Sequence, residues 1–222
     1  MNARLSDRKL IMLGAGGHAR VLLAILRAQG AAIEGCVALA PPDGRWPSDI
    51  PYLGRSDALS QFDPSAVALT NGIGSAGAIA ARRDEFELAC RAGFAFRGVR
   101  HEQTIIDPSA EVDDNALIMA GAIVQPGARV GANALINTGA IVDHDCVIGA
   151  HCHVATGARL AGGVILGESV HVGAGATIIQ GIEIGARAVI AAGAAIVRAV
   201  ESGSTHGGVP GRNLLRLERP SC

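Results

Sequence analysis

The chain has few aromatic residues, an odd number of cysteines and almost no net charge. Only four Phe, one Trp and one Tyr occur among 222 residues, although 49% are hydrophobic, so its core must be aliphatic. The five cysteines include no Cys-x-x-Cys pair and the first residues are too charged for a signal peptide, so we expect a reduced, cytoplasmic protein. The chain contains no apolar run of membrane-spanning length. A net charge of −1 argues against nucleic acid or membrane partners.

A strict six-residue repeat occupies the chain from Ile106 to Val200. Six residues provide one short strand and a corner, and only stacked units bury a continuous file of side chains. The repeat therefore predicts a parallel β-helix in which residues 18 apart stack at about 4.7–4.9 Å. A disordered tract is disfavoured, because such tracts lack a strict aliphatic period. The leading aliphatic residues are Ile106, Val112, Ile118, Val124, Val130, Ile136, Val142, Ile148, Val154, Leu160, Leu166, Val172, Ile178, Ile184, Ile190 and Ile196.

Residues 1–100 have a different pattern, in which short apolar runs alternate with helical segments. The first and third runs should each be followed by a helix, which is typical of a small Rossmann-like parallel α/β domain. We therefore expect three parts: a Rossmann-like domain at residues 1–100, a β-helix at 101–200 and a capping segment at 201–222. The strands expected in the first part are Lys9–Leu13, Ala32–Leu39, Ser65–Thr70 and Phe94–Val99.

The turn after the first expected strand is rich in glycine and contains Gly14, Gly16, Gly17 and His18. A strand, glycine-rich turn and helix in this order present backbone N–H groups and a helix N-terminus to a phosphate. The turn fits the loose form of a dinucleotide motif, but the acidic residue expected after the second strand is missing near Leu39. The turn is therefore either a nucleotide phosphate site, which we favour, or a plain tight turn. His18 either reaches the ligand or only begins the helix.

Four of the seven histidines lie in the middle of the repeat, namely His144, His151, His153 and His171. His144 lies two residues after an inward-facing aliphatic residue, in an outward-facing turn between Asp143 and Asp145. An adjacent carboxylate can hold one ring nitrogen as a donor and leave the other as a base with a raised pKa. The alternative is a solvated turn with incidental charges. His153 and His171 should stack on successive coils, where they bind a metal, line a cleft or have no function, but a metal needs three converging ligands.

The repeat resembles the left-handed β-helix of the hexapeptide acyltransferases, which are typically trimers with active sites between subunits. A narrower set of motifs is similar to the bacterial sugar O- and N-acetyltransferases grouped with sialic acid O-acetyltransferase. Members of that group N-acetylate nucleotide-linked 4-amino-sugars. The motifs that carry this resemblance are Gly14-Ala15-Gly16-Gly17-His18, Asp107-Pro108-Ser109-Ala110, Asn137-Thr138-Gly139-Ala140, Val142-Asp143-His144-Asp145-Cys146, His153-Val154 and Gly208-Val209-Pro210-Gly211.

The resemblance implies roles for residues in the repeat. By position, His144 matches the catalytic base and Asp145 matches the acid that orients it. Asn137 matches an active-site asparagine, and His153 matches a residue that contacts acetyl-CoA near its thioester.

Further positions match the binding sites of the two substrates. Gly162, Ala174 and Ala192 match backbone positions that line the pantetheine groove of the coenzyme. The turn from Gly14 to His18 matches the loop that receives the sugar nucleotide.

The chain departs from the family pattern at three places. Relatives often carry an aspartate near Leu39 and a different glycine pattern at Asn71-Gly72-Ile73-Gly74, and both departures leave the nucleotide open. Asp107 replaces a frequent histidine, so we do not count this position as catalytic.

The resemblance implies acetyl-CoA-dependent N-acetylation of the 4-amino group of a nucleotide-activated amino-deoxysugar, of the UDP-4-amino-sugar or GDP-perosamine type. This reaction would serve the synthesis of surface or glycoprotein glycans, by direct attack with a histidine base and without a metal. O-acetylation of a sialic acid is the nearest alternative. Alternatives from other classes are a zinc lyase resembling the β-helical carbonic anhydrases and a non-catalytic nucleotide-binding trimer.

The C-terminal segment begins with a turn-rich exit from the coils at Glu201–Gly211. Arg212, Arg216 and Arg219 alternate with leucines after it. This pattern suggests a short helix that caps the open end. Its arginines either contact the phosphates of the coenzyme or form a solvated basic tail.

Overall fold

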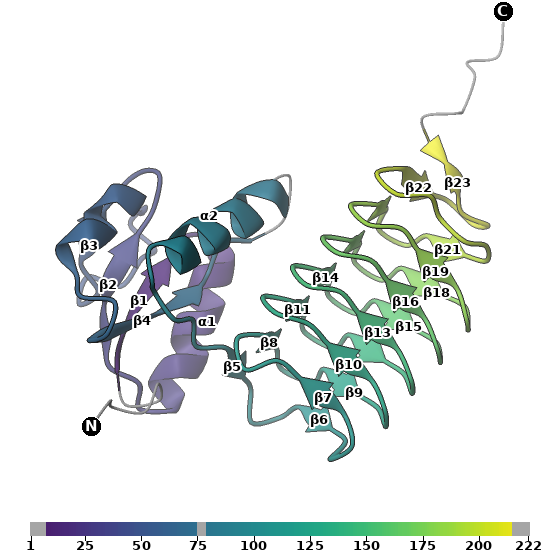
Figure 1. Ribbon diagram of the computed structural model, residues 1–222, viewed down its shortest axis with the longest axis horizontal. Helices are drawn as coiled ribbons and strands as arrows, with labels where there is room; N and C mark the ends of the chain where they lie inside the picture. Colours follow the sequence, from purple (N-terminus) through teal and green to yellow (C-terminus); the bar gives the residue numbers. More distant parts are fainter. Residues whose placement is uncertain (1–7, 75–78, 215–222) are drawn as a thin grey trace, which may run out of the picture. The chain divides into compact units, whose positions relative to one another are not determined.

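The computed structural model describes residues 8–74 and 79–214 (Figure 1). The chain divides into two compact units, Met1–Val99 and Arg100–Cys222. Each unit has its own hydrophobic core, which is mainly aliphatic in both. No helix within the described residues is long and apolar enough to cross a membrane.

The first unit is the predicted small parallel α/β domain. Its four strands are all parallel and lie in the order β3-β2-β1-β4, so the central strand β1 has neighbours on both sides. Phe86 and Ala89 of α2 join Ile11, Leu13 and Leu69 in one core cluster on the sheet. The elements are β1 (Lys9–Leu13), α1 (Gly17–Ala28), β2 (Ile33–Val37), β3 (Tyr52–Gly54), the 3-10 helix η2 (Ser56–Gln61), β4 (Val67–Asn71) and α2 (Ile79–Arg91).

The expected strand at Phe94–Val99 is wrong. Only an isolated bridge joins Phe96 to Leu69 there, while Val99 and Arg100 form β5 at the boundary between the units. Phe94 and Phe96 are both buried in the core, so the alternating apolar pattern reflects side-chain packing without a continuous ladder. The strand β3 and the helix η2 were not predicted, because both are very short.

The second unit is the predicted parallel β-helix, and Figure 1 shows its stacked coils in teal to yellow. Each strand has two residues, of which the second is the leading aliphatic residue of a repeat. The strands are β6 (Ile105–Ile106), β7 (Glu111–Val112), β8 (Leu117–Ile118), β9 (Ile123–Val124), β10 (Arg129–Val130), β11 (Leu135–Ile136), β12 (Ile141–Val142), β13 (Val147–Ile148), β14 (His153–Val154), β15 (Arg159–Leu160), β16 (Ile165–Leu166), β17 (His171–Val172), β18 (Thr177–Ile178), β19 (Glu183–Ile184), β20 (Val189–Ile190) and β21 (Ala195–Ile196).

Every third strand pairs in parallel, which confirms that residues 18 apart are stacked. Ile141 of β12 is paired with Arg159 of β15, and Val142 with Leu160. The pairs assemble into three sheets, one on each face of the coil. The leading residues and their small partners fill the interior, and Cys146 is fully buried there as a free thiol, as predicted for a small hydrophobic residue.

The C-terminal segment closes one sheet with two further strands. β22 (Thr205–Gly207) is parallel to β20, and β23 (Arg212–Asn213) is antiparallel to β22. The predicted helix is therefore wrong at Arg212, because this residue pairs with the backbone at the free edge of β22. Arg216 and Arg219 lie outside the described residues.

Candidate active site

The corner between β12 and β13 presents His144 to solvent. Val142 and Cys146 point into the core on either side, so the residues between them must point outward. The His144 side chain is 61% exposed. Its backbone is fixed on two sides, since its N–H donates to Asp143 Oδ1 at 2.8 Å and its carbonyl accepts from Gly163 N–H at 2.8 Å.

His144 and Asp145 form a hydrogen-bonded pair. The distance from His144 Nδ1 to Asp145 Oδ2 is 2.9 Å. A carboxylate only accepts, so Nδ1 carries the hydrogen and Nε2 is left as a base. The hydrogen bond to Asp145, assisted by the charge of Asp143, raises the pKa of His144 above its usual value. Asp145 has a φ of 57°, a conformation that costs a residue with a side chain about 1–3 kcal/mol and is often found at functional sites.

Gly162 lies against the imidazole of His144. It is 18 residues later in the sequence and thus occupies the same corner on the next coil. A Cβ built on Gly162 would overlap Nε2 and Cε1 of His144. Among the sixteen repeats, Gly162 is the only glycine at the position two residues after the leading aliphatic residue. The ring therefore occupies space that a side chain fills at every other corner of this kind.

Asn137, His153 and His171 form a second group on the sheet that contains β11, β14 and β17. The Asn137 Oδ1 accepts the N–H of Thr138 at 2.8 Å, so its Nδ2 donates to His153 Nε2 at 3.1 Å. His153 is then neutral, with its hydrogen on Nδ1. Its ring meets that of His171 edge-on, with centroids 5.0 Å apart. Burial lowers the pKa of His171, so its ring favours the neutral form.

The structure brings His144, Asp145 and Gly162 together, but it places Asn137 and His153 elsewhere on the coil. Val142, which precedes His144, belongs to the sheet that contains β12. His153 belongs to a different sheet, which contains β14. Within one chain the two groups therefore lie on different sheets of the β-helix.

Ala174 and Ala192 lie at a third location, on successive coils after β17 and β20. They are exposed, and the N–H of Gly193 donates to the Ala174 carbonyl at 2.9 Å, which stacks the two corners. The small side chains of Ala174 and Ala192 leave room along this edge. Gly162 does not lie on this edge, because it belongs to the corner that contacts His144.

The histidines do not form a metal site among themselves. Within the described parts of the chain, no three of the four repeat histidines bring ring nitrogens within 4.8 Å of one another. His151 is instead bonded through Nδ1 to the Asn133 side chain at 2.9 Å.

The glycine turn after β1 lies beside a second glycine turn after β4. A Cβ on Gly14 would lie 3.2 Å from the backbone of Gly72, and Gly14 has a φ of 86°. A Cβ on Gly72 would lie 2.6 Å from Met12 Sδ, so both glycines are needed for this close approach. The strand order reverses between β1 and β4. Ligands of open α/β sheets bind at such a point, at the carboxyl ends of the strands.

The amino end of α1 faces this point. Gly16 is the extended N-cap residue and Gly17 is the first helical residue, so their N–H groups have no partner from a preceding turn of helix. No acidic residue occupies the first turn of α1. This arrangement favours a bound anion.

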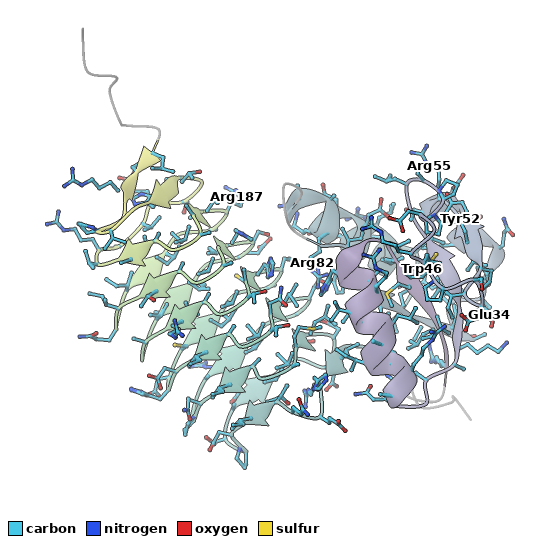
Figure 2. All side chains as sticks on the ribbon, turned by 180° about the vertical axis from the view of Figure 1, so that it is seen from behind. Glu34, Trp46, Tyr52, Arg55, Arg82 and Arg187 are labelled. Carbon is cyan, nitrogen blue, oxygen red and sulfur yellow. The ribbon has the colours of Figure 1, made fainter. Side chains whose placement is uncertain are left out.

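Arg82 of α2, labelled in Figure 2, is buried under the second glycine turn. It donates to the carbonyls of Asn71 at 2.8 Å and Ile73 at 3.0 Å. Burial lowers its pKa to about 9, which leaves it charged at neutral pH. Burial, together with the charge of Arg82, lowers the pKa of His18 to about 3. His18 is thus neutral at neutral pH.

Two buried thiols are unsuited to covalent catalysis. Burial raises the pKa of Cys36 to about 11 and that of Cys152 to about 12. A cysteine nucleophile acts as the thiolate, so neither residue is activated.

Comparisons with known proteins define the class. The bacterial transferase hexapeptide model matches residues 127–162, and the hexapeptide repeat of succinyl-transferase matches residues 163–198. Both models describe hexapeptide repeats of transferases, which agrees with the repeat of the β-helix. The comparison with curated sequences gives no significant match.

Two solved structures are similar over nearly the whole chain. The acetyltransferase domain of PglB from Neisseria gonorrhoeae, in complex with acetyl coenzyme A, is 32% identical with a TM-score of 0.84, over 94% of this chain and 100% of that one. A variant of GDP-perosamine N-acetyl transferase from Caulobacter crescentus, in complex with CoA and GDP-perosamine, is 32% identical with a TM-score of 0.86, over 95% and 99%. The chain belongs to the hexapeptide-repeat sugar acetyltransferases, as the resemblance predicted.

WeeI from Acinetobacter baumannii has the same fold. It is 20% identical with a TM-score of 0.65, over 94% of this chain and 100% of that one. Family membership disfavours the zinc lyase and the non-catalytic trimer.

Proposed function

We propose that the protein transfers the acetyl group of acetyl-CoA to the 4-amino group of a nucleotide-linked amino-deoxysugar. The sugar would be of the UDP-4-amino-sugar or GDP-perosamine type, and the reaction would take place in the cytoplasm, where thiols stay reduced. The observation that carries the proposal is the exposed His144–Asp145 pair, in a chain whose relatives include an N-acetyltransferase bound to CoA and GDP-perosamine.

His144 acts as the general base in the proposed reaction. Its Nε2 accepts a proton from the sugar amine as the amine nitrogen bonds to the thioester carbonyl carbon. The carbon–sulfur bond then breaks, the sulfur leaves with the electron pair, and His144 returns the proton to it. Asp145 keeps the hydrogen on Nδ1 and stabilises the charged imidazole.

His153 is the proposed donor to the thioester carbonyl. Its Nδ1–H can stabilise the oxygen as negative charge develops there, because a fixed donor needs no reorganisation during the reaction. Asn137 holds His153 in the required tautomer. Ala174 and Ala192, which are small and exposed, leave space for the narrow pantetheine arm.

The two glycine turns together form the proposed sugar-nucleotide site. Gly14, Gly16 and Gly17 would present N–H groups and the α1 amino end to the diphosphate. The charge of Arg82 would strengthen this attraction, and neutral His18 would bind the ligand by hydrogen bonding.

We propose a homotrimer with active sites between subunits, because the two residue groups lie on different sheets. A mixture of His144→Ala and His153→Ala chains, assembled together, should recover activity that neither variant has alone. Each mixed trimer has three interfaces, of which one combines both intact groups, so about a third of wild-type activity is expected.

The recovered activity is measured after co-expression with two different affinity tags and purification through both. Mixing the two purified variants without exchange of subunits is the control and should stay inactive. Co-assembled trimers without recovered activity would contradict a shared site.

Replacing Asp145 with asparagine should shift the pH dependence of kcat to lower pH. The base must be neutral, so the rate rises as pH increases through the pKa of His144. Asp145 raises that pKa, and its loss returns the pKa toward the ordinary value of 6.5. A pH–rate profile of both proteins measures the shift. Asp114→Asn, which removes an exposed aspartate from another turn of the β-helix, is the control and should leave the profile unchanged.

Incubation with acetyl-CoA and a panel of acceptors tests the function as a whole. UDP-, GDP- and CDP-linked 4-amino-sugars should release free coenzyme thiol and give the N-acetylated product by mass spectrometry. Preference for a free sialic acid would favour O-acetylation. If none of the acceptors in the panel is acetylated and the purified protein contains stoichiometric zinc, the lyase would be favoured.

A further inference from the structure

A column of hydrogen-bonded turns leads from the start of the β-helix to the His144–Asp145 pair. Ser109, Gly127 and Asp145 are 18 residues apart and occupy one corner on three successive coils. The Ser109 N–H and hydroxyl both donate to Asp107 Oδ1, at 2.9 and 2.6 Å. Gly127 N–H donates to Ser109 Oγ at 3.1 Å, and Asp145 N–H donates to the Pro126 carbonyl at 3.0 Å. Each turn is thus bonded to the next.

Gly127 faces the carboxylate of Asp145. A Cβ on Gly127 would lie 2.6 Å from Asp145 Oδ1, while the backbone nitrogen of Asp145 would be 3.8 Å away. The first distance is too short for two atoms that are not bonded, and the second is ordinary contact. A side chain at position 127 would therefore displace the carboxylate more easily than the backbone. The other oxygen of this carboxylate holds His144 Nδ1.

We infer that Gly127 is a positioning residue for the reaction, which sets the Asp145 carboxylate and through it the orientation of His144. Ser109 and Asp107 support it by holding the Gly127 turn. This inference rests on the proposed function of His144. It also gives a role to the Asp107-Pro108-Ser109 motif, whose aspartate stands where relatives often have histidine.

The charges around these groups are consistent with the role. Hydrogen bonds from Ser109 hold the pKa of Asp107 below its usual range, so it is an ionised acceptor at neutral pH. His144 is faced by Asp143 and Asp145 of its own turn. The stacked turns above and below it consist of Gly162–Gly163 and Pro126–Gly127, which have no ionisable side chain.

Gly127→Ala tests the inference in the full-length protein. The variant should lower kcat about tenfold, a fraction of what a general base contributes, and leave KM for acetyl-CoA unchanged. Its pH–rate profile should move to lower pH, because a displaced Asp145 no longer raises the pKa of His144. A merely structural role would not move that profile.

Gly203→Ala is the matched control. Gly203 has a φ of 69°, against 70° at Gly127, so alanine meets the same backbone strain at both positions. Among the described residues, however, nothing lies within 4 Å of a Cβ at Gly203. Its kcat and pH profile should equal those of the wild type.

Ser109 provides a second test that does not depend on the fold of the Gly127 variant. Ser109→Ala should lower kcat several-fold with the same direction of pH shift, and Ser109→Thr should restore both because it keeps the hydroxyl. If His144→Ala is inactive but Gly127→Ala has wild-type kinetics, the inference is overturned. If the glycine variant does not fold, wild-type kinetics of Ser109→Ala overturn the inference in its place. An active His144→Ala protein would instead overturn the proposed function.

Discussion

Replacing His144 with alanine should lower kcat for acetyl transfer by about 10²–10⁴-fold, the range that a positioned general base contributes. The thioester is already activated, so the remaining task is to remove a proton from the attacking amine in the right place. Nε2 of His144 is available for this, because Nδ1 is bonded to Asp145. Initial rates with saturating acetyl-CoA and acceptor measure the loss.

The assembly should survive this substitution, because the His144 side chain is 61% exposed and lies outside the aliphatic core. Thermal unfolding and elution volume should match those of the wild type. His101→Ala is a suitable control, since His101 is also a turn histidine and its Nδ1 accepts the Gln103 N–H. A His144 variant with at least a tenth of wild-type kcat would refute the assignment.

Replacing Gly162 with alanine should lower kcat by about 10²-fold, because a catalytic group displaced by about 1 Å can cost that much. The new Cβ would overlap Nε2 and Cε1 of His144 and force the imidazole away. The φ of Gly162 is outside the positive range, so alanine introduces no backbone strain. The kcat of the purified variant, measured beside its unfolding temperature, separates displacement of the base from loss of stability.

Gly44→Ala is the control for this variant. Gly44 also lacks a positive φ, and no described residue lies within 4 Å of a Cβ placed there. It should retain full activity. If Gly162→Ala also retains wild-type kcat, the position of the imidazole in the resting enzyme is not the catalytic one.

The register of the β-helix could be predicted to the residue, because its period leaves no freedom. Sixteen branched aliphatic residues in one phase fix which side chains point inward, and the 18-residue stacking follows from three strands per coil. The α/β unit was less predictable at its ends. Phe94 and Phe96 alternate as in a strand, but they bury their rings without forming a ladder.

The His144–Asp145 pair was predictable from adjacent residues, whereas contacts between coils were missed. Gly162 had been matched to the coenzyme groove, and its contact with the His144 ring was not foreseen. The signal was present, because Gly162 is the one glycine at its repeat position and lies 18 residues after His144. Gly127 and Asp145 are likewise 18 residues apart and occupy the same corner on successive coils. Reading the repeat as columns of 18 therefore finds contacts that reading along the chain does not.

The relation between His144 and His153 does not follow from a single chain. They are nine residues apart, which is half a coil. His144 lies at the corner after β12, whereas His153 lies in β14, which belongs to a different sheet. In the proposed trimer, the symmetry of the assembly would relate them. The mixed-trimer experiment addresses this relation.

A crystal structure of the assembly with CoA and a nucleotide 4-amino-sugar tests the central claim most directly. We expect the amine nitrogen about 2.6–3.2 Å from His144 Nε2, with the coenzyme sulfur beside it. We also expect His153 of a neighbouring subunit on the other side of the sulfur. An amine bound far from every His144, or a metal ion coordinated by this imidazole, would contradict it.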